Sequence, residues 1–233
     1  IAIDAEYQAS YKQRLNQPEQ PTGFKPFWRS EMGVQRRPDW YASVKMSSKR
    51  VIGSETCNSE NMQGLHLGDG MLLLYQRGAE YEDIVPVWDW KRLPGTTCDQ
   101  GLKKLDPKGS SGGYGGSGFS GVIGAGDTGV AAMIYQRNDL VARKAWFFLK
   151  DEIVCLGAGI TGETEGSVYT SVEQSWKKGA VEQGDDWVYH AGVGYQFIDG
   201  PPVVQSETVE GNWNRSFPTR GNRPARGDVF SMW

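Results

Sequence analysis

Apolar and polar residues follow one another in short runs along most of the chain, and this pattern predicts strands. Residues 41–46 alternate in polarity, and residues 70–76 contain an unbroken apolar run that begins after a glycine. Alternation with a period of two is typical of a half-buried strand, and a short apolar run is typical of a fully buried one. The same reasoning predicts further strands at residues 121–125, 130–135, 187–190 and 193–197.

One pair of segments predicts a β-hairpin. Residues 142–149 carry three consecutive aromatic residues, and residues 152–156 follow after only Lys150 and Asp151. Two strands that are separated by two polar residues are typical of a hairpin. Because the strands are closely spaced and helical periodicity is almost absent, we expect an all-β fold, a sandwich of antiparallel sheets.

The N-terminal segment differs from the rest of the chain. Residues 1–15 predict a short helix, and residues 16–25 with the following Pro26 are rich in proline and predict a linker. We therefore divide the chain into residues 1–26, a helix and linker, and residues 27–233, one β-sandwich domain. The chain starts at Ile1 and ends in an apolar run that predicts a further strand. We expect it to be a piece of a longer protein whose sandwich is truncated at its C-terminal end.

A glycine motif raises the question of nucleotide binding. Gly157, Gly159 and Gly162 have the spacing of a dinucleotide-binding turn and follow an apolar run. Such a turn needs a helix after it to hold the pyrophosphate, but Gly166 and an alternating stretch at residues 168–172 follow instead. We expect a glycine-rich turn between two strands and no NAD or ATP.

A second glycine-rich segment, residues 109–118, lacks the lysine followed by serine or threonine of a phosphate loop. This composition favours a flexible surface loop.

Composition narrows the class of protein. The chain has 233 residues, of which 38% are hydrophobic and 23% charged, so it is long enough for a core and unlike a disordered chain. The net charge of −3 argues against a nucleic-acid partner, and no apolar run is long enough for a membrane span. The 31 glycines, 9 tryptophans and 10 tyrosines agree with an all-β fold that has many turns.

The cysteines and histidines give no sign of a metal or a nucleophile. Cys57, Cys98 and Cys155 are an odd number without metal-ligand spacing, so we expect neither a disulfide framework nor a zinc site. His66 and His190 are the only histidines, and each is more easily explained as a structural residue than as a base. We predict no metal and no cofactor.

The densest polar cluster lies at residues 50–64. It contains Glu55, Asn58, Glu60 and Asn61 between two predicted strands. An asparagine amide offers a donor and an acceptor together, which suits sugar hydroxyls and carboxylates. The alternative is a turn whose polar side chains satisfy their own backbone, and the residue types alone favour this alternative slightly.

A second cluster contains two tryptophans and a cation. Trp88 and Trp90 alternate with Asp89, so both indoles would face one side of a strand, next to Arg92. Two rings beside a cation would form a stacking surface for an acidic sugar. The alternative, that both rings fill the core, is equally well supported by the sequence.

Several motifs occur in an order that resembles a known family. The sequence reads SETCNSEN at residues 54–61, GDG at 68–70, PVWDW at 86–90 and LPGTT at 93–97, with KAWFF at 144–148 further on. This order is similar to that of the central β-sandwich domain of the family 8 polysaccharide lyases, which include hyaluronate, chondroitin AC and xanthan lyases. The resemblance begins near residue 27 and extends to residue 233.

The resemblance implies a fold and a reaction. Family 8 lyases have an N-terminal α/α toroid followed by a large antiparallel β supersandwich, so residues 1–26 would be the end of the helical domain and its linker. The implied reaction is β-elimination on a uronic-acid polymer, with chondroitin or hyaluronan as the expected substrate. The main catalytic residues of the family lie on the toroid, so this chain alone is expected to be inactive.

The resemblance also assigns residues and partners. Glu55 matches a glutamate that orients catalytic side chains, Asn58 an asparagine that contacts sugar, and Glu60 and Asn61 a pair that we interpret as structural. Trp88, Trp90 and Arg92 remain candidates for substrate binding. The implied partners are an acidic polysaccharide and the toroid domain of the same protein, with no nucleic acid and no membrane, in an extracellular or periplasmic location. The alternative is a non-catalytic carbohydrate-binding module of the same fold.

Overall fold

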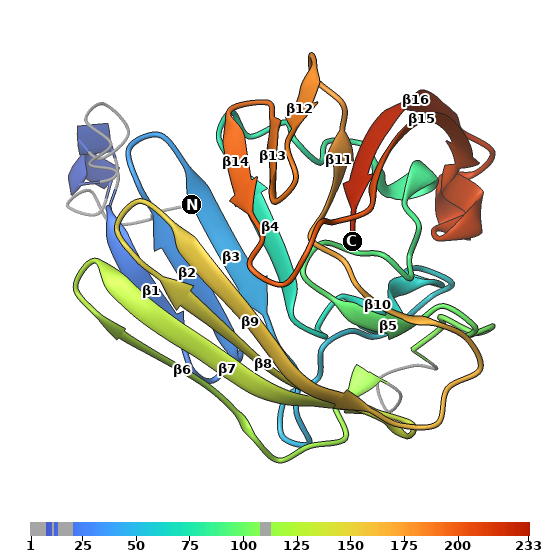
Figure 1. The fold of residues 1–233 in the computed structure, drawn as a ribbon, viewed down its shortest axis with the longest axis horizontal. Coiled ribbons are helices and arrows are strands. Elements are labelled where there is room, and N and C mark those ends of the chain that lie inside the picture. The colour runs from blue at the N-terminus through green and yellow to red at the C-terminus, as the bar shows by residue number, and fades with distance from the viewer. Residues whose placement is uncertain (1–7, 11, 14–20, 108–112) are drawn as a thin grey trace.

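The computed structural model describes residues 8–10, 12–13, 21–107 and 113–233. Their regular secondary structure is almost entirely antiparallel strands, joined by turns, loops and short 3-10 segments (Figure 1). The predicted all-β class is therefore confirmed. None of the helices in the described residues has the length and apolar character that crossing a membrane requires.

Two four-stranded sheets form the first half of the molecule. The first has the order β1-β2-β3-β4 and consists of β1 (Gly23–Phe27), β2 (Met32–Arg36), β3 (Tyr41–Lys45) and β4 (Met71–Tyr75). The second has the order β6-β7-β8-β9 and consists of β6 (Ser120–Ala125), β7 (Thr128–Arg137), β8 (Leu140–Phe148) and β9 (Ile153–Thr161). The two sheets lie face to face and bury a common core (Figure 1).

Two three-stranded sheets and a strand pair form the second half. One sheet has the order β11-β16-β15, with β11 (Glu173–Trp176), β15 (Val204–Asn212) and β16 (Pro224–Met232). The other has the order β12-β13-β14, with β12 (Val181–Gln183), β13 (Trp187–His190) and β14 (Val193–Gln196). The pair is β5 (Thr97–Asp99) with β10 (Val168–Thr170). The 3-10 segments are η1 (Gly64–His66), η2 (Val85–Val87), η4 (Trp213–Arg215) and η5 (Pro218–Arg220).

Strand β4 joins the two halves because its two faces belong to different cores. Leu72 and Leu74 pack against the core between the four-stranded sheets, whereas Met71, Leu73 and Tyr75 pack into the core of the second half. Successive residues of a strand point to opposite faces, so a strand between two cores needs apolar residues at every position. This explains the unbroken apolar run in the sequence.

The core between the four-stranded sheets is built around Phe24. Its ring lies 5.0 Å from that of Phe148 and covers three glycines on neighbouring strands. A Cβ atom would come within 2.9 Å of the ring at Gly33, 2.5 Å at Gly124 and 2.1 Å at Gly129. The glycines are therefore required here for space.

The predicted hairpin is confirmed, but the predicted glycine turn is wrong. β8 and β9 pair antiparallel as expected, and β9 continues through Gly157 and Gly159 to Thr161. The register shifts by one residue between Val141 and Arg143, and Gly159 has a φ of +60°. Glycine in the left-handed region allows such a β-bulge, so the glycines bend a strand rather than end it.

The predicted N-terminal helix, the linker and the second glycine-rich loop agree with the structure to different extents. Only residues 8–10 and 12–13 of the predicted N-terminal helix lie among the described residues, and they are helical. β1 begins at Gly23, within the predicted linker. Of the predicted flexible loop, residues 108–112 lie outside the described part, and residues 113–116 are bound to the sandwich through Gly53, Ser48 and Gln136.

We predict that Gly129→Ala lowers the free energy of unfolding by about 1–3 kcal/mol, because the new methyl group collides with the Phe24 ring. The measurement is urea-induced unfolding followed by tryptophan fluorescence. Gly121→Ala in β6 is the matched control, since nothing lies within 4 Å of its Cβ position. Equal stability of the two variants would contradict this account of the core.

Candidate functional site

The connection between β3 and β4 presents a tight turn to the solvent. Cys57 and Glu60 form an isolated antiparallel bridge, and the Glu60 amide donates to the Cys57 carbonyl oxygen at 2.8 Å. The two central residues, Asn58 and Ser59, have φ values of +51° and +59°. Two left-handed central residues are the signature of a type I′ turn, in which asparagine is favoured. The predicted sugar contact, Asn58, thus lies exposed at the tip of this turn.

Glu55 lies beside the turn and is also exposed. Among the described residues, the side chains of Glu55 and Asn58 have no hydrogen-bond or ion-pair partner. The neighbouring polar residues are instead engaged: Thr56 Oγ1 donates to Asp106 Oδ1 at 2.7 Å, and Thr219 Oγ1 donates to Glu60 Oε1 at 2.8 Å. The structure therefore places both predicted residues at the surface of the same connection and leaves their polar groups accessible. Their roles toward a substrate stay predictions.

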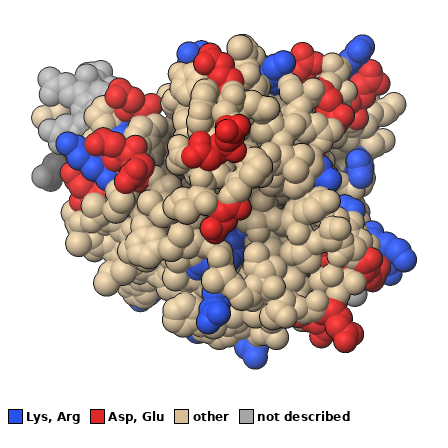
Figure 2. All heavy atoms as spheres, viewed as in Figure 1, with Lys and Arg blue, Asp and Glu red and all other residues tan. Residues whose placement is uncertain are grey.

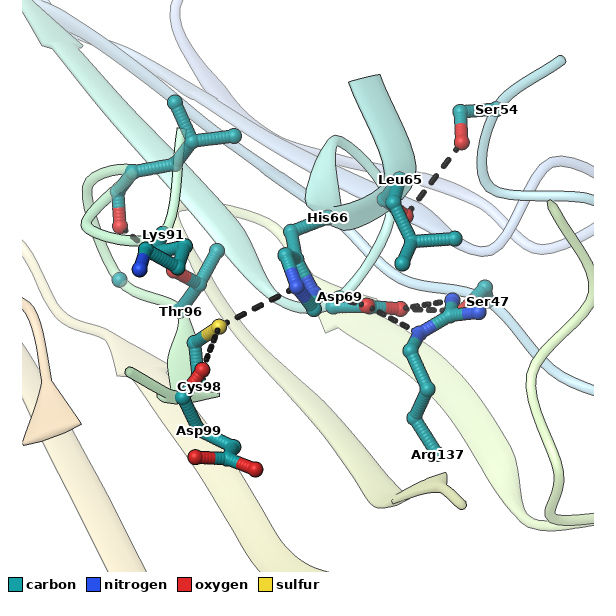
Figure 3. A network of polar contacts seen from close by, with 12 residues as sticks. Ser47, Ser54, Leu65, His66, Asp69, Lys91, Thr96, Cys98, Asp99 and Arg137 are labelled. Carbon is teal, nitrogen blue, oxygen red and sulfur yellow. Dashed lines mark hydrogen bonds and ion pairs between the residues drawn. The ribbon is translucent and has the colours of Figure 1, made fainter. Parts of the chain in front are cut away.

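A buried polar cluster fixes the base of this connection (Figure 3). Arg137 donates to Asp69 through two hydrogen bonds, from Nε to Oδ2 at 2.8 Å and from Nη2 to Oδ1 at 2.9 Å. Asp69 also lies 2.8 Å from His66 Nδ1 and accepts from Ser47 Oγ at 3.1 Å. His66 Nε2 lies 3.2 Å from Cys98 Sγ. Planar, bidentate arginine–carboxylate pairs are among the strongest polar contacts in proteins.

The protonation states in this cluster follow from its charges. Burial alone would raise the pKa of Asp69, but the Arg137 guanidinium and the hydrogen bond from His66 hold it well below its usual range. Burial, reinforced by the charge of Asp69, raises the pKa of the Cys98 thiol to about 12. Cys98 and His66 are fully buried, and a buried cysteine with a raised thiol pKa is typical of a structural residue rather than a nucleophile. The cluster is structural.

The cluster holds the connection at both ends and across the sandwich. Ser47 follows β3 at the start of the connection, and His66 and Asp69 precede β4 at its end. Arg137 is the last residue of β7 in the opposite sheet. The exposed turn at residues 57–60 is therefore carried by a segment whose two ends meet at one buried carboxylate.

Trp88 and Trp90 are buried, at 7% and 3% exposure, in the core of the second half. They follow η2 rather than lying on a strand, and their rings meet edge to face with centroids 5.6 Å apart. Both rings therefore fill the core, which was the alternative interpretation of the sequence, and they form no open stacking surface. They nevertheless line, with Arg92 and Arg215, a pocket of 340 Å³ beside β15.

Arg92 is held against aromatic rings at the surface of the second half. Its guanidinium lies 3.8 Å from the ring centroid of Trp233 and 5.4 Å from that of Tyr169. Nε donates to Gln100 Oε1 at 3.2 Å. These contacts fix the Arg92 side chain, and its contact with sugar stays a prediction.

Acidic and basic side chains are interspersed over the face of the molecule shown in Figure 2.

A buried acid that the sequence did not single out lies where the core of the second half meets a smaller core formed by Val188, Phe230 and Met232. Glu173 accepts hydrogen bonds from Tyr81 Oη at 2.9 Å and from Tyr195 Oη at 3.2 Å. Burial raises the pKa of Glu173 to about 7, although these hydrogen bonds act in the opposite direction. The only signal in the sequence was a glutamate in an alternating stretch, which is also common on exposed strands.

Comparison with known proteins defines the family. Residues 22–233 match the super-sandwich domain of polysaccharide lyase family 8, so the chain belongs to this family. Its match to a chondroitinase-AC from Pedobacter heparinus has 34% identity over 229 residues, 89% of this chain and 32% of that protein. A xanthan lyase from a Bacillus species is 30% identical over 235 residues, 88% of this chain and 24% of that protein.

Solved structures agree with the sequence relatives. The chondroitin AC lyase of Streptomyces coelicolor in complex with chondroitin sulphate superimposes with a TM-score of 0.85 and 30% identity, over 91% of this chain and 30% of that chain. A chondroitinase AC lyase solved with oligosaccharides gives a TM-score of 0.87 over 99% of this chain and 38% of that chain. The chain thus spans about a third or less of the length of its sequence relatives.

We predict that Arg137→Gln lowers the free energy of unfolding by about 3–5 kcal/mol, because it leaves the Asp69 carboxylate buried without its main counter-charge. Urea unfolding at neutral pH measures this. Arg226→Gln is the matched control, since its ion pair with Glu210 is 70% exposed on both sides and should contribute at most about 1 kcal/mol. If both variants lost the same free energy of unfolding, the buried Arg137–Asp69 pair would contribute no more than an exposed ion pair.

We predict that Glu173→Gln weakens the pH dependence of stability. The folded pKa of Glu173, about 7, lies above its usual value of 4.5. Its stabilising contribution is therefore complete below pH 4.5 and lost as the pH rises through 7. Melting temperatures between pH 4.5 and 8 should fall less steeply in the variant than in the wild type, whereas the exposed control Glu207→Gln should follow the wild type. An unchanged slope in Glu173→Gln would contradict the assignment.

Proposed function

We propose that this chain is the β-sandwich part of a polysaccharide lyase that cleaves a uronic-acid polymer, with chondroitin or hyaluronan as the preferred candidates. One observation carries the proposal. A family 8 super-sandwich domain extends over residues 22–233, and within it Asn58 is exposed on a tight turn with its amide unpartnered among the described residues.

The proposed reaction is a β-elimination. A base removes the proton at C5 of the uronate, the electrons form a C4=C5 double bond, and the glycosidic oxygen leaves C4 with a proton. Negative charge that develops at the carboxylate needs neutral or cationic hydrogen-bond donors around it. We place the base and the main donors on an α/α domain that precedes this chain in the whole protein.

Asn58 and Glu55 would then form part of the wall that faces this domain. The Asn58 amide can donate to and accept from sugar hydroxyls, since no described side chain competes for it. The Glu55 carboxylate is available as a hydrogen-bond acceptor for a cation of the other domain, which it would orient. Asn58 would act as a substrate contact and Glu55 as a positioning residue.

The pocket beside Trp88, Trp90 and Arg92 is the proposed second contact with the polymer. Its lining combines apolar and aromatic side chains with polar and charged ones, and the charged residues are Lys91, Arg92 and Arg215 with Asp89 and Glu207. The three cations outnumber the two carboxylates, which suits an acidic sugar. The ring edges, rather than open ring faces, would contact the sugar.

A polymeric substrate also favours an extracellular or periplasmic location for the whole protein.

The deciding experiment uses the full-length protein that contains this chain. It is mixed separately with chondroitin sulfate, hyaluronan and xanthan, and the ultraviolet absorbance of the new C4=C5 bond is followed. A rise with at least one polymer supports lyase activity and identifies the substrate. Binding of a polymer without any rise would indicate a carbohydrate-binding module and overturn the proposal.

We predict that Asn58→Gly in the full-length protein lowers kcat/KM by about tenfold to a hundredfold, as expected for a lost hydrogen bond to a charged or sugar group. Glycine tolerates the left-handed backbone, so the turn is retained. Ser59→Gly is the matched control and should retain wild-type turnover. Unchanged turnover in Asn58→Gly would remove Asn58 from the site.

A further inference from the structure

The exposed turn has few contacts that could hold it in place. Asn58 and Ser59 both adopt the left-handed conformation, which is uncommon for residues other than glycine. Among the described residues neither side chain makes a hydrogen bond. Apart from its own Cys57–Glu60 bridge and the hydrogen bond from Thr219 to Glu60, the turn depends on the residues that flank it.

Asn61, the next residue after the turn, connects both flanks. Its Nδ2 donates to the Glu55 carbonyl oxygen at 2.7 Å, so the side chain spans the base of the turn. Its own carbonyl oxygen accepts from the Gly64 amide at 3.3 Å. Thr56 Oγ1 also lies 3.3 Å from this oxygen, but donates its proton to the nearer Asp106 Oδ1. The φ of +61° at Asn61 directs the chain into these contacts. Two hydrogen bonds at one residue therefore close the loop between residues 55 and 64.

Gly64 leaves space for the Asn61 side chain. A Cβ atom at Gly64 would lie 1.8 Å from Asn61 Oδ1, so any other residue would push the amide out of place. The φ of Gly64 is not in the left-handed region, and glycine is required here only for space. The position of the Asn61 amide thus depends on the path of η1.

η1 is fixed by the buried cluster. His66 ends η1 and contacts Asp69, which is paired with Arg137 of the opposite sheet. Ser54 Oγ also donates to the carbonyl oxygen of Leu65 in η1 at 3.4 Å, which joins the other flank of the turn to the same segment (Figure 3). A continuous chain of contacts therefore leads from the Arg137–Asp69 pair to the exposed turn.

We propose that Asn61 is a positioning residue, whose side-chain amide ties the two flanks of the Cys57–Glu60 turn together beside η1 and thereby holds Asn58 in its substrate-contacting position. This role rests on the proposed function, in which Asn58 contacts the polysaccharide. The role is measured as an interaction between Asn61 and Asn58.

The test is a double-mutant cycle in the full-length protein, with the polymer that it cleaves. Asn61→Gly keeps the left-handed backbone and removes the clamp. One lost hydrogen bond allows the turn to leave its productive conformation for most of the time, and kcat/KM should fall about tenfold. The same substitution in an Asn58→Gly background should change kcat/KM less than twofold, because the residue through which Asn61 acts is gone.

Two further variants exclude a general loss of structure. Ser59→Gly changes another left-handed residue of the same turn without removing a hydrogen bond, and should stay within twofold of the wild type. Gly64→Ala displaces the Asn61 amide from a different side and should reproduce the loss, again only when Asn58 is present. The melting temperature of each variant is recorded, and the effect should appear in KM more than in kcat, as expected for a substrate contact.

The outcomes separate this inference from the proposed function. If Asn58→Gly alone leaves turnover unchanged, the proposed role of Asn58 fails. If Asn58→Gly lowers turnover but Asn61→Gly has no effect, or has the same effect in both backgrounds, the positioning role of Asn61 is overturned and the proposed function stands. A tenfold loss that disappears in the Asn58→Gly background supports the inference.

Discussion

The buried carboxylate of Asp69 is the constraint on which the architecture around the candidate site depends. Arg137 reaches it from β7 of one sheet, Ser47 from the end of β3, and His66 from the segment that leads into β4. An ionised carboxylate in a core is costly unless its charge is compensated and its oxygens are hydrogen-bonded. All of these contacts must therefore form together, and they fix where the β3–β4 connection leaves and re-enters the sandwich.

This base carries an exposed turn with a left-handed backbone. Asn58, Ser59 and Asn61 all have positive φ values within one short segment. Asparagine tolerates this conformation better than most residues, and left-handed non-glycine residues are concentrated at turns and functional sites. Here the turn presents an asparagine amide that no described residue of the chain uses. The arrangement agrees with a family whose members act on acidic polysaccharides and with a role for this turn at the substrate.

The sequence predicted the fold class and the position of the turn at residues 57–60 better than it predicted how the side chains pack. The long hairpin of β8 and β9 and the buried strand β4 were recognisable because their apolar pattern is strong. β15 was missed, since VQSETVEGN is mostly polar on an edge strand, and the glycines of β9 imitated a turn because a bulge and a turn use the same residue type. The motif at residues 54–61 located Glu55 and Asn58 by resemblance. The contacts of Asp69 with Arg137, 68 residues away, could not be inferred from local pattern.

The most direct test of the account is a crystal structure of the full-length protein with a bound acidic oligosaccharide. The account predicts that the Asn58 amide lies within about 3.2 Å of a sugar oxygen, in ordinary hydrogen-bond range. It also predicts that the type I′ turn and the Asp69–Arg137 pair are unchanged from the structure described here. An oligosaccharide bound away from the turn at residues 57–60, or a turn rebuilt on binding, would contradict the claim that the sandwich holds Asn58 ready for the substrate.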